Sequence, residues 1–332
     1  MTTPAVPLSI LDLCPVTVGS TPAIALRNSL ELVQHAEKTG YKRFWVAEHH
    51  NMTGIASAAT SVVIGYLAAG TQHIRIGSGG IMLPNHAPLQ IAEQFGTLES
   101  LYPGRIDLGL GRAPGSDMAT ARALRRGLAD GSDFPQMFEE LRYYLAEPEP
   151  GQRIIAVPGA GLNIPMWLLG SSTFSAHMSA SLGLPFAFAG QFSPDSMMAA
   201  IQTYHDNFTP SETLQKPHFM LGINAFVAAT RDEAHFLATS HQQSFLNLIR
   251  GQRGQLRPPV EDMDALWQPH EKHQVLSTLA GTLIGDEATV SQQMADLLER
   301  SGADELIVNT PIYDQEKRCE SYSRLMTAAS NL

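Results

Sequence analysis

The sequence predicts an α/β fold, a single (β/α)8 barrel of the TIM type with insertions. Three observations support this prediction. Short apolar segments alternate with amphipathic ones roughly eight times, which is the pattern of a parallel sheet with crossover helices. The chain has 332 residues, whereas a barrel of this kind takes about 250, so insertions account for the rest of one domain spanning 1–332. An apolar fraction of 44% excludes a disordered chain.

The strands are predicted where apolar residues stand together between turn signals. They cover residues 8–13, 43–47, 73–77, 106–110, 166–169, 185–189, 221–228 and 305–309. The helices between and after them are predicted at 21–40, 57–69, 89–101, 134–145, 172–182, 194–208, 231–249 and 316–329. The first helix illustrates the reasoning, because Pro22 suits a first helical position and Gly40 suits a helix end.

The extra length is placed in the loop after Arg112, in 147–163 and above all in 251–281. The segment 251–281 is Pro-rich and irregular, and we expect it to be either a lid over the site or a packed elaboration of the barrel rim. A doubly wound open sheet is the alternative to a closed barrel, and two domains also fit the length.

Charge and cysteine content narrow the function classes. The net charge of −10 and the lack of a basic block argue against nucleic acid or an anionic membrane as a partner. Two cysteines, Cys14 and Cys319, are too few for a disulfide framework. Neither a secretory signal nor a membrane span is predicted, so we expect a cytoplasmic enzyme or binding protein.

Residues that follow the second predicted strand are candidates for acid–base chemistry. This strand is followed by Glu48, His49 and His50. Successive side chains of an extended chain point to opposite sides, so at most one of these histidines faces the barrel axis. A histidine there suits proton transfer because imidazole titrates near neutrality; the alternative is a hydrogen bond to a neighbouring loop. The spacing matches neither an HxH nor an HExxH pattern, and no metal site is predicted.

Three further strand ends suggest sites for a flat group and an anion. Gly79 and Gly80 indicate a tight turn or a backbone that approaches something flat. Arg112 follows the fourth strand, where a guanidinium can hold a phosphate or form an ordinary salt bridge. The fifth strand runs through 170–175, a Gly-Ser-Ser-Thr-Phe-Ser sequence, into a helix whose start suits either an anion or a simple serine N-cap.

These same runs resemble a known family. AEHHN at 47–51, IGSGGIMLPNHAPLQIAEQF at 76–95 and YPGRIDLGLGRAPGSD at 102–117 together resemble the bacterial luciferase-like flavin monooxygenases. GSSTFSAHMSASLGLP at 170–185 and ADELIVN at 303–309 fit the same family, so the resemblance spans nearly the whole chain except 251–281. Within the family, the sequence most resembles the uncharacterised luciferase paralogues of enterobacteria rather than the light-emitting luciferase subunits.

The resemblance implies a barrel that binds reduced FMN at the carboxyl ends of its strands. It places His49 at the family's catalytic imidazole and Arg112 at its phosphate-binding arginine. Gly79-Gly80 falls on a non-proline cis peptide that packs against the flavin ring.

The helix start after the fifth strand completes the implied cofactor site. Ser172 and Ser175 fall on the hydroxyls of the family's phosphate site, with Gly170 and Ser171 beside them. The implied reaction is that of an oxidoreductase on paired donors. Reduced flavin and O2 oxygenate a small organic substrate, and a flavin reductase or NAD(P)H supplies the electrons.

Two departures argue against light emission. Gly111 stands where luciferase has a reactive cysteine, and Gly190 or a neighbour stands where it has a tryptophan. Hydride transfer with a deazaflavin or flavin and non-catalytic flavin binding remain alternatives. A metal-dependent hydrolase needs converging ligands that Glu48, His49 and His50 alone do not supply. The resemblance also implies a homodimer, and the sequence does not identify the substrate.

Overall fold

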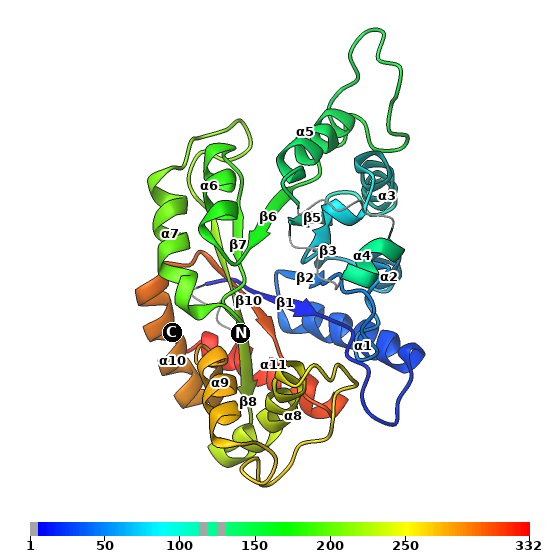
Figure 1. Cartoon of the computed structure of the whole chain (residues 1–332). Helices are drawn as coiled ribbons and strands as arrows, with labels where there is room; N and C mark the ends of the chain where they lie inside the picture. The colour runs from blue at the N-terminus through cyan, green and yellow to red at the C-terminus, as the bar shows by residue number, and fades with distance from the viewer. Residues whose placement is uncertain (1–5, 113–117, 125–130) are drawn as a thin grey trace.

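The computed structural model describes residues 6–112, 118–124 and 131–332 (Figure 1). Eight parallel strands close into a barrel, which confirms the predicted fold class and excludes the open sheet. Their bounds are β1 Leu8–Asp12, β2 Arg43–Val46, β3 Arg75–Ser78, β5 Ile106–Gly111, β6 Met166–Gly170, β7 Phe186–Phe188, β8 Phe219–Val227 and β10 Glu305–Asn309. The barrel closes through β10, which pairs with both β1 and β8.

Two short strands lie outside this ring. β4 (Ile81–Met82) pairs with the end of β5, and β9 (Leu283–Gly285) pairs with the end of β8. Neither is predicted from the sequence, because two or three residues are too few to show an alternating pattern.

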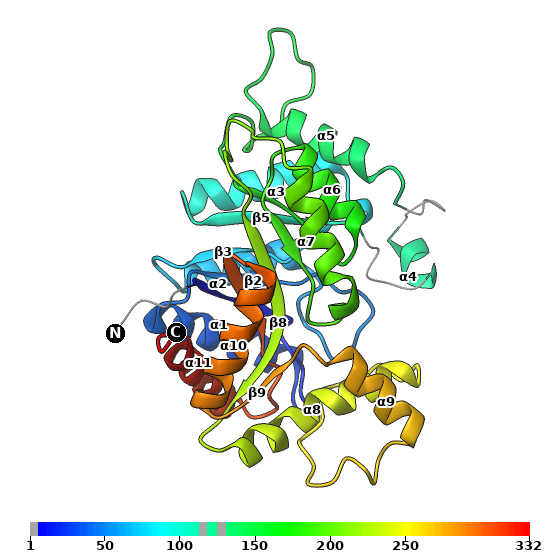
Figure 2. The same cartoon turned by 90° about the vertical axis from the view of Figure 1, so that its left-hand side faces the viewer.

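Helices cover the outside of the barrel (Figure 2). Their bounds are α1 Pro22–Thr39, α2 Thr60–Ala69, α3 Pro88–Leu101, α4 Met118–Ala123, α5 Phe134–Leu145, α6 Thr173–Ser181, α7 Met197–Asp206, α8 Arg231–Ile249, α9 Pro269–Thr278, α10 Glu287–Ser301 and α11 Gln315–Ala329, with short 3-10 turns η1 Leu83–Asn85 and η2 Pro194–Ser196. The predicted bounds of α5 and α8 are correct. α1 ends as expected at Gly40, which has a φ of 90°.

The sequence analysis misses α4, α9 and α10. α10 buries only Val290, Met294, Leu297 and Ser301, so its apolar stripe is narrow and easily overlooked. Its start is nevertheless well defined, because the Asp286 side chain accepts a hydrogen bond of 2.9 Å from the backbone N–H of Thr289.

The interior of the barrel is apolar at mid-height and charged at its amino-terminal base. The apolar layer is Leu11, Trp45, Ala47, Trp167, Ala187, Met220 and Ile307. Below it, the Arg43 guanidinium lies 2.6 Å from Asp107 and 2.7 Å from Glu305. Both carboxylates are fully buried, so the base is closed by paired charges and the opposite end carries the candidate site.

The two predicted insertions inside the described ranges have different forms. The segment after α5 projects from the top of the molecule (Figure 1). The segment after α8 runs past the loop after β1, where Leu256 exchanges backbone hydrogen bonds of 2.8 and 2.9 Å with Val18 and Val16. These bonds support the rim-elaboration alternative for 251–281. Part of the third predicted insertion, the loop after Arg112, lies outside the described residues.

No helix within the described ranges is both long and apolar enough to cross a membrane.

Candidate active site at the carboxyl ends of the strands

The chain alternates between the two sides of the barrel wall as it leaves β2. Trp45 and Ala47 belong to the apolar layer inside the barrel. His49 has the same parity, whereas Glu48 and His50 have the opposite one. Because β2 ends at Val46, this parity leaves the inner position of His49 as a prediction.

His49 is partly buried and has charged neighbours of both signs, Glu48 and Arg253. Burial lowers the pKa of His49 below its ordinary value of 6.5 and outweighs the neighbouring Glu48 charge, which raises it. Arg253, from the segment after α8, is close enough to lower this pKa further. The irregular 251–281 segment thus contributes a charge beside His49.

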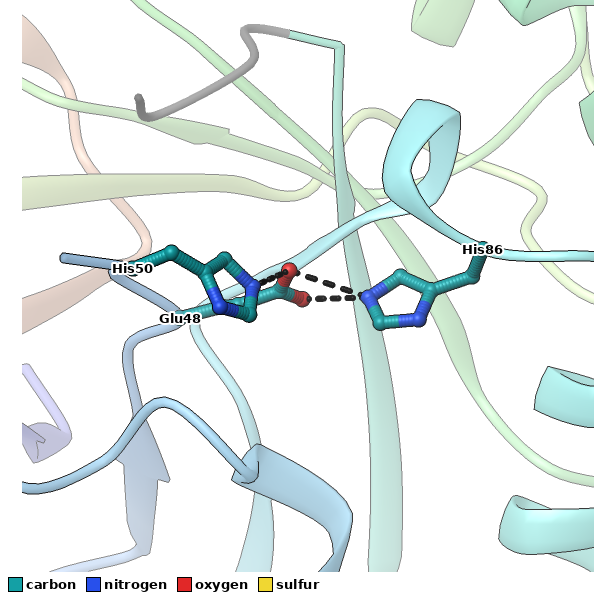
Figure 3. Close-up of side chains that lie close together, drawn as sticks. All are labelled: Glu48, His50 and His86. Carbon is teal, nitrogen blue, oxygen red and sulfur yellow. Dashed lines mark hydrogen bonds and ion pairs between the residues drawn. The ribbon is translucent and has the colours of Figure 1, made fainter. Parts of the chain in front are cut away.

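Glu48, which follows the end of β2, is the centre of a polar cluster (Figure 3). Its Oε1 lies 2.7 Å from His50 Nε2 and 2.9 Å from His86 Nε2. The backbone N–H of Met82 and the Asn85 amide also donate to this carboxylate, at 2.9 and 3.1 Å. Burial raises the pKa of Glu48, but the hydrogen bonds from His86 and His50 outweigh burial and leave the pKa below its usual value.

Sequence reasoning considers Glu48 and His50 without a third partner. His86 joins them because β4 and η1 carry it back to the end of β2. His86 lies 36 positions after His50, too far for the two to form a recognisable ligand motif. Only the fold brings His86 into the cluster.

The peptide between Gly79 and Gly80 is cis, in agreement with the family resemblance. Neighbouring strands account for both glycines. A Cβ on Gly79 would lie 2.6 Å from the Leu11 side chain, and one on Gly80 would lie 2.8 Å from the Gly109 carbonyl oxygen. Packing within the protein therefore favours glycine at both positions, most strongly at Gly80, where the neighbour is backbone.

Arg112 and the start of α6 lie together at the ends of neighbouring strands. β5 and β6 pair in parallel up to Gly111 and Leu169. The Arg112 guanidinium carbon lies 4.2 Å from the centre of the Phe174 ring, in the first turn of α6. Within the described ranges no carboxylate pairs with Arg112, which leaves its positive charge uncompensated there.

The start of α6 is not capped by a side chain. Ser172 has the extended N-cap backbone, yet its hydroxyl makes no capping hydrogen bond. Gly170 lets the helix come close, because a Cβ there would lie 2.5 Å from the Ser175 hydroxyl oxygen. The backbone N–H groups of a first turn and the positive end of the helix dipole attract anions. With Ser171 and Arg112 beside it, this helix start has the chemistry of a phosphate site.

The sequence-predicted residues thus fall into two groups at one end of the barrel. His49 follows β2, and the candidate anion-binding residues follow β5 and β6. The sequence analysis misses Phe174, although it lies inside the 170–175 run already singled out. The signal that could have identified Phe174 is that it is an aromatic residue three positions after Ser171, because aromatic rings are common neighbours of arginine side chains.

Neither cysteine is an activated thiol. Both are free. Burial raises the pKa of Cys14 and raises that of Cys319 to about 11.

The luciferase-like monooxygenase family model matches residues 7–305. The chain is 51% identical to a luciferase-like monooxygenase of Escherichia coli K12, over all of this chain and 99% of that one. It is 32% identical to the N-acetyl-S-alkylcysteine monooxygenase of Bacillus subtilis, over 97% of each chain. Among solved structures, apo-MsnO8 superposes with a TM-score of 0.86 at 35% identity, over 97% of this chain and 98% of that one.

More distant structures share the fold alone. The oxygenating constituent of 3,6-diketocamphane monooxygenase, solved with FMN, has a TM-score of 0.74 at 17% identity, over 98% of each chain. An F420-dependent secondary alcohol dehydrogenase has a TM-score of 0.63 at 14% identity, over 98% of this chain and 99% of that one.

Proposed function

The chain belongs to the luciferase-like monooxygenase family, and we propose that it is an FMN-dependent monooxygenase that oxygenates a small organic substrate with O2. Structural neighbours bind flavin or deazaflavin cofactors, as their names state. The proposal of FMN rests on the residues at the carboxyl ends of β5 and β6.

One observation carries this proposal. Arg112, which lacks a carboxylate partner among the described residues, lies against the uncapped start of α6. A guanidinium and free backbone N–H groups together suit a phosphate dianion. Ser171, Ser172 and Ser175 would add hydroxyl or backbone donors to the FMN phosphate. A flavin held there would lie at the barrel mouth, where barrel enzymes place their chemistry.

The remaining residues would orient the ring and handle protons. The Gly79-Gly80 turn would support one face of the ring, since it presents backbone and no side chain. His49, predicted on the inner side of the wall, would donate or accept a proton at the substrate or flavin. Bound reduced flavin supplies the electrons that activate O2. The protein's part is to bind the phosphate, exclude water and position this imidazole.

The source of electrons and the assembly are further parts of the proposal. We propose that a separate flavin reductase, using NAD(P)H, delivers reduced FMN. We also propose a homodimer through α2 and α3, because the side chains of Val62, Tyr66 and Leu101 are 71%, 42% and 63% exposed on these helices. Light scattering tests this assembly: Val62→Glu should yield monomers, and a monomeric wild type would contradict the proposal. The cytoplasmic location stays a prediction from the sequence.

The function is tested by cofactor binding and oxygen use. Equilibrium dialysis with FMN, riboflavin and F420 should show FMN bound most tightly. Reduced FMN on the protein should then consume O2 and transfer an ¹⁸O atom to a product in a substrate screen supplied with a flavin reductase. Preference for F420 without oxygen transfer would overturn the proposal in favour of hydride transfer. FMN binding with unchanged reoxidation and no product would indicate a non-catalytic flavin-binding protein.

A further inference from the structure

Glu48, His50 and His86 form a cluster that has no role in the proposed flavin chemistry. Two imidazoles and one carboxylate converge from separate loops: Glu48 and His50 follow β2, and His86 follows η1 (Figure 3). One ligand atom from each of the three lies within 4.8 Å of the others. Glu48 and His50 differ in parity from His49 along the chain after β2, and none of the three has a role in the flavin chemistry proposed above.

We propose that Glu48, His50 and His86 bind a divalent transition-metal ion, with Zn²⁺ as the best match. Two histidines and one carboxylate form a ligand set that zinc and related ions use with a further position open to water. Both imidazoles present Nε2 to the same carboxylate, at 2.7 Å from His50 and at 2.9 and 3.0 Å from His86.

Metal binding requires the three side chains to shift. In a tetrahedral site with bonds of about 2.1 Å, the ligand atoms stand about 3.4 Å apart. The Nε2–Oε distances of the cluster therefore have to lengthen by less than about 1 Å, and ligand atoms as far apart as the 4.8 Å limit have to approach each other by about 1.4 Å. Binding through Nε2 requires each imidazole to present the lone pair of that nitrogen to the ion instead of an N–H to Glu48.

The carboxylate is already supported for this role. The backbone N–H of Met82 donates to Oε2 at 2.9 Å, and the Asn85 amide donates to Oε1 at 3.1 Å. Such outer hydrogen bonds fix the orientation of a ligating carboxylate. Glu48 is 1% exposed, so water hydrates its carboxylate poorly. A bound cation would balance this buried negative charge.

The cluster lines a cavity of about 400 Å³, whose wall also includes Thr60 and Val62 of α2 and Gln94 of α3. Because Val62 also belongs to the proposed dimer face, an ion would enter this cavity in the separate chain. Because the metal would tie the loop after β2 to the segment after β4, it would hold in place two loops, one carrying His49 and the other following Gly80. This is a positioning role, independent of flavin binding.

Metal binding is tested on the full-length chain after chelator treatment and dialysis. Titration with Zn²⁺, followed by elemental analysis of the dialysed protein, should find one ion per chain. Cobalt substitution should give the intense visible absorption of a four- or five-coordinate site with nitrogen ligands.

Variants locate the site. His86→Gln and His50→Gln should each weaken Zn²⁺ binding by at least about 100-fold, and Zn²⁺ should raise the Tm of the wild type but not of these variants. His73→Gln is the matched control, since His73 is exposed and lies outside the cluster. Circular dichroism verifies that each variant is folded. Substoichiometric binding by the wild type, or equal binding by His86→Gln, would overturn the proposal and leave the cluster as a hydrogen-bonded carboxylate. Neither outcome depends on FMN.

Discussion

Arg112 stacks on Phe174, with its guanidinium carbon 4.2 Å from the ring centre, and so joins the end of β5 to the first turn of α6. Stacking leaves the edge of a guanidinium free for hydrogen bonds, because its N–H groups lie in the plane of the group. The contact therefore fixes Arg112 beside an uncapped helix start without consuming its donors.

Arg112→Ala should weaken FMN binding by about 10- to 100-fold, the loss expected for a charge-assisted phosphate contact of about 1.5–3 kcal/mol. Riboflavin, which lacks the phosphate, should bind within about twofold of wild type. Fluorescence titration of both flavins measures the difference. The control is Arg142→Ala, because Arg142 is exposed and pairs only with Glu139 in α5. Equal losses for the two flavins would remove Arg112 from the phosphate site.

Phe174→Leu should weaken FMN binding by about two- to fivefold, since a cation–π contact at a partly exposed site contributes about 0.5–1 kcal/mol. Leucine keeps the bulk and removes the ring face. Tyr143→Leu, an exposed aromatic position on α5, is the control in the same titration. An unchanged FMN affinity would show that the ring does not position Arg112.

His49→Gln should lower the turnover rate by about 100-fold or more, as for loss of a general acid or base, while FMN affinity stays within about twofold. Oxygen consumption and product formation measure turnover, and the fluorescence titration measures affinity. His73→Gln serves as the control because its side chain is exposed. Wild-type turnover in His49→Gln would assign His49 to structure.

The ionisation of Glu305 should make the free energy of unfolding depend on pH in the acid range. Burial raises its pKa, but the His218 imidazole, 3.6 Å away, and the charges of Arg43 and Lys42 outweigh burial and lower the pKa to about 2 from an ordinary 4.5. Because the folded state holds the ionised form, this contribution is complete above about pH 5 and is lost as the pH falls towards 2. It amounts to about 3 kcal/mol.

Glu305→Gln should therefore cost about 3–5 kcal/mol in the free energy of unfolding at pH 7, because Arg43 loses a buried partner. The stability of this variant should fall less than that of wild type between pH 5 and 2. Urea denaturation across this range measures both effects. Glu212→Gln, at an exposed position, provides the comparison. Parallel pH curves for Glu305→Gln and wild type would contradict the assignment.

Gly80→Ala should destabilise the fold by about 1–3 kcal/mol, the usual cost of overpacking, because its Cβ would lie 2.8 Å from the Gly109 carbonyl oxygen. Gly254→Ala should change stability by less than about 0.5 kcal/mol, since a Cβ there meets nothing within 4 Å. Urea denaturation at pH 7 compares them. Equal stability of the two variants would show that β5 moves easily away from this turn.

Local sequence signals predict most of the fold. Apolar clusters locate all eight barrel strands, and the Pro22 and Gly40 signals locate α1, because these patterns act over a few residues. The same signals fail where an element buries little, as in α10, or is only two residues long, as in β4.

The sequence by itself determined the barrel and the strand ends that carry polar residues, and parity beyond β2 predicts that at most one of His49 and His50 faces the barrel axis. Only the tertiary structure decided which residues meet. Arg112 reaches Phe174 because β5 and β6 are neighbours in the closed sheet. His86 reaches Glu48 because the turn after Gly80 brings the chain back to β2. Arg43 meets Asp107 because β3 alone separates β2 from β5, and it meets Glu305 because β10 pairs with β1 beside β2. Contacts between residues distant in the chain depend on strand order and closure, and no local pattern contains that information.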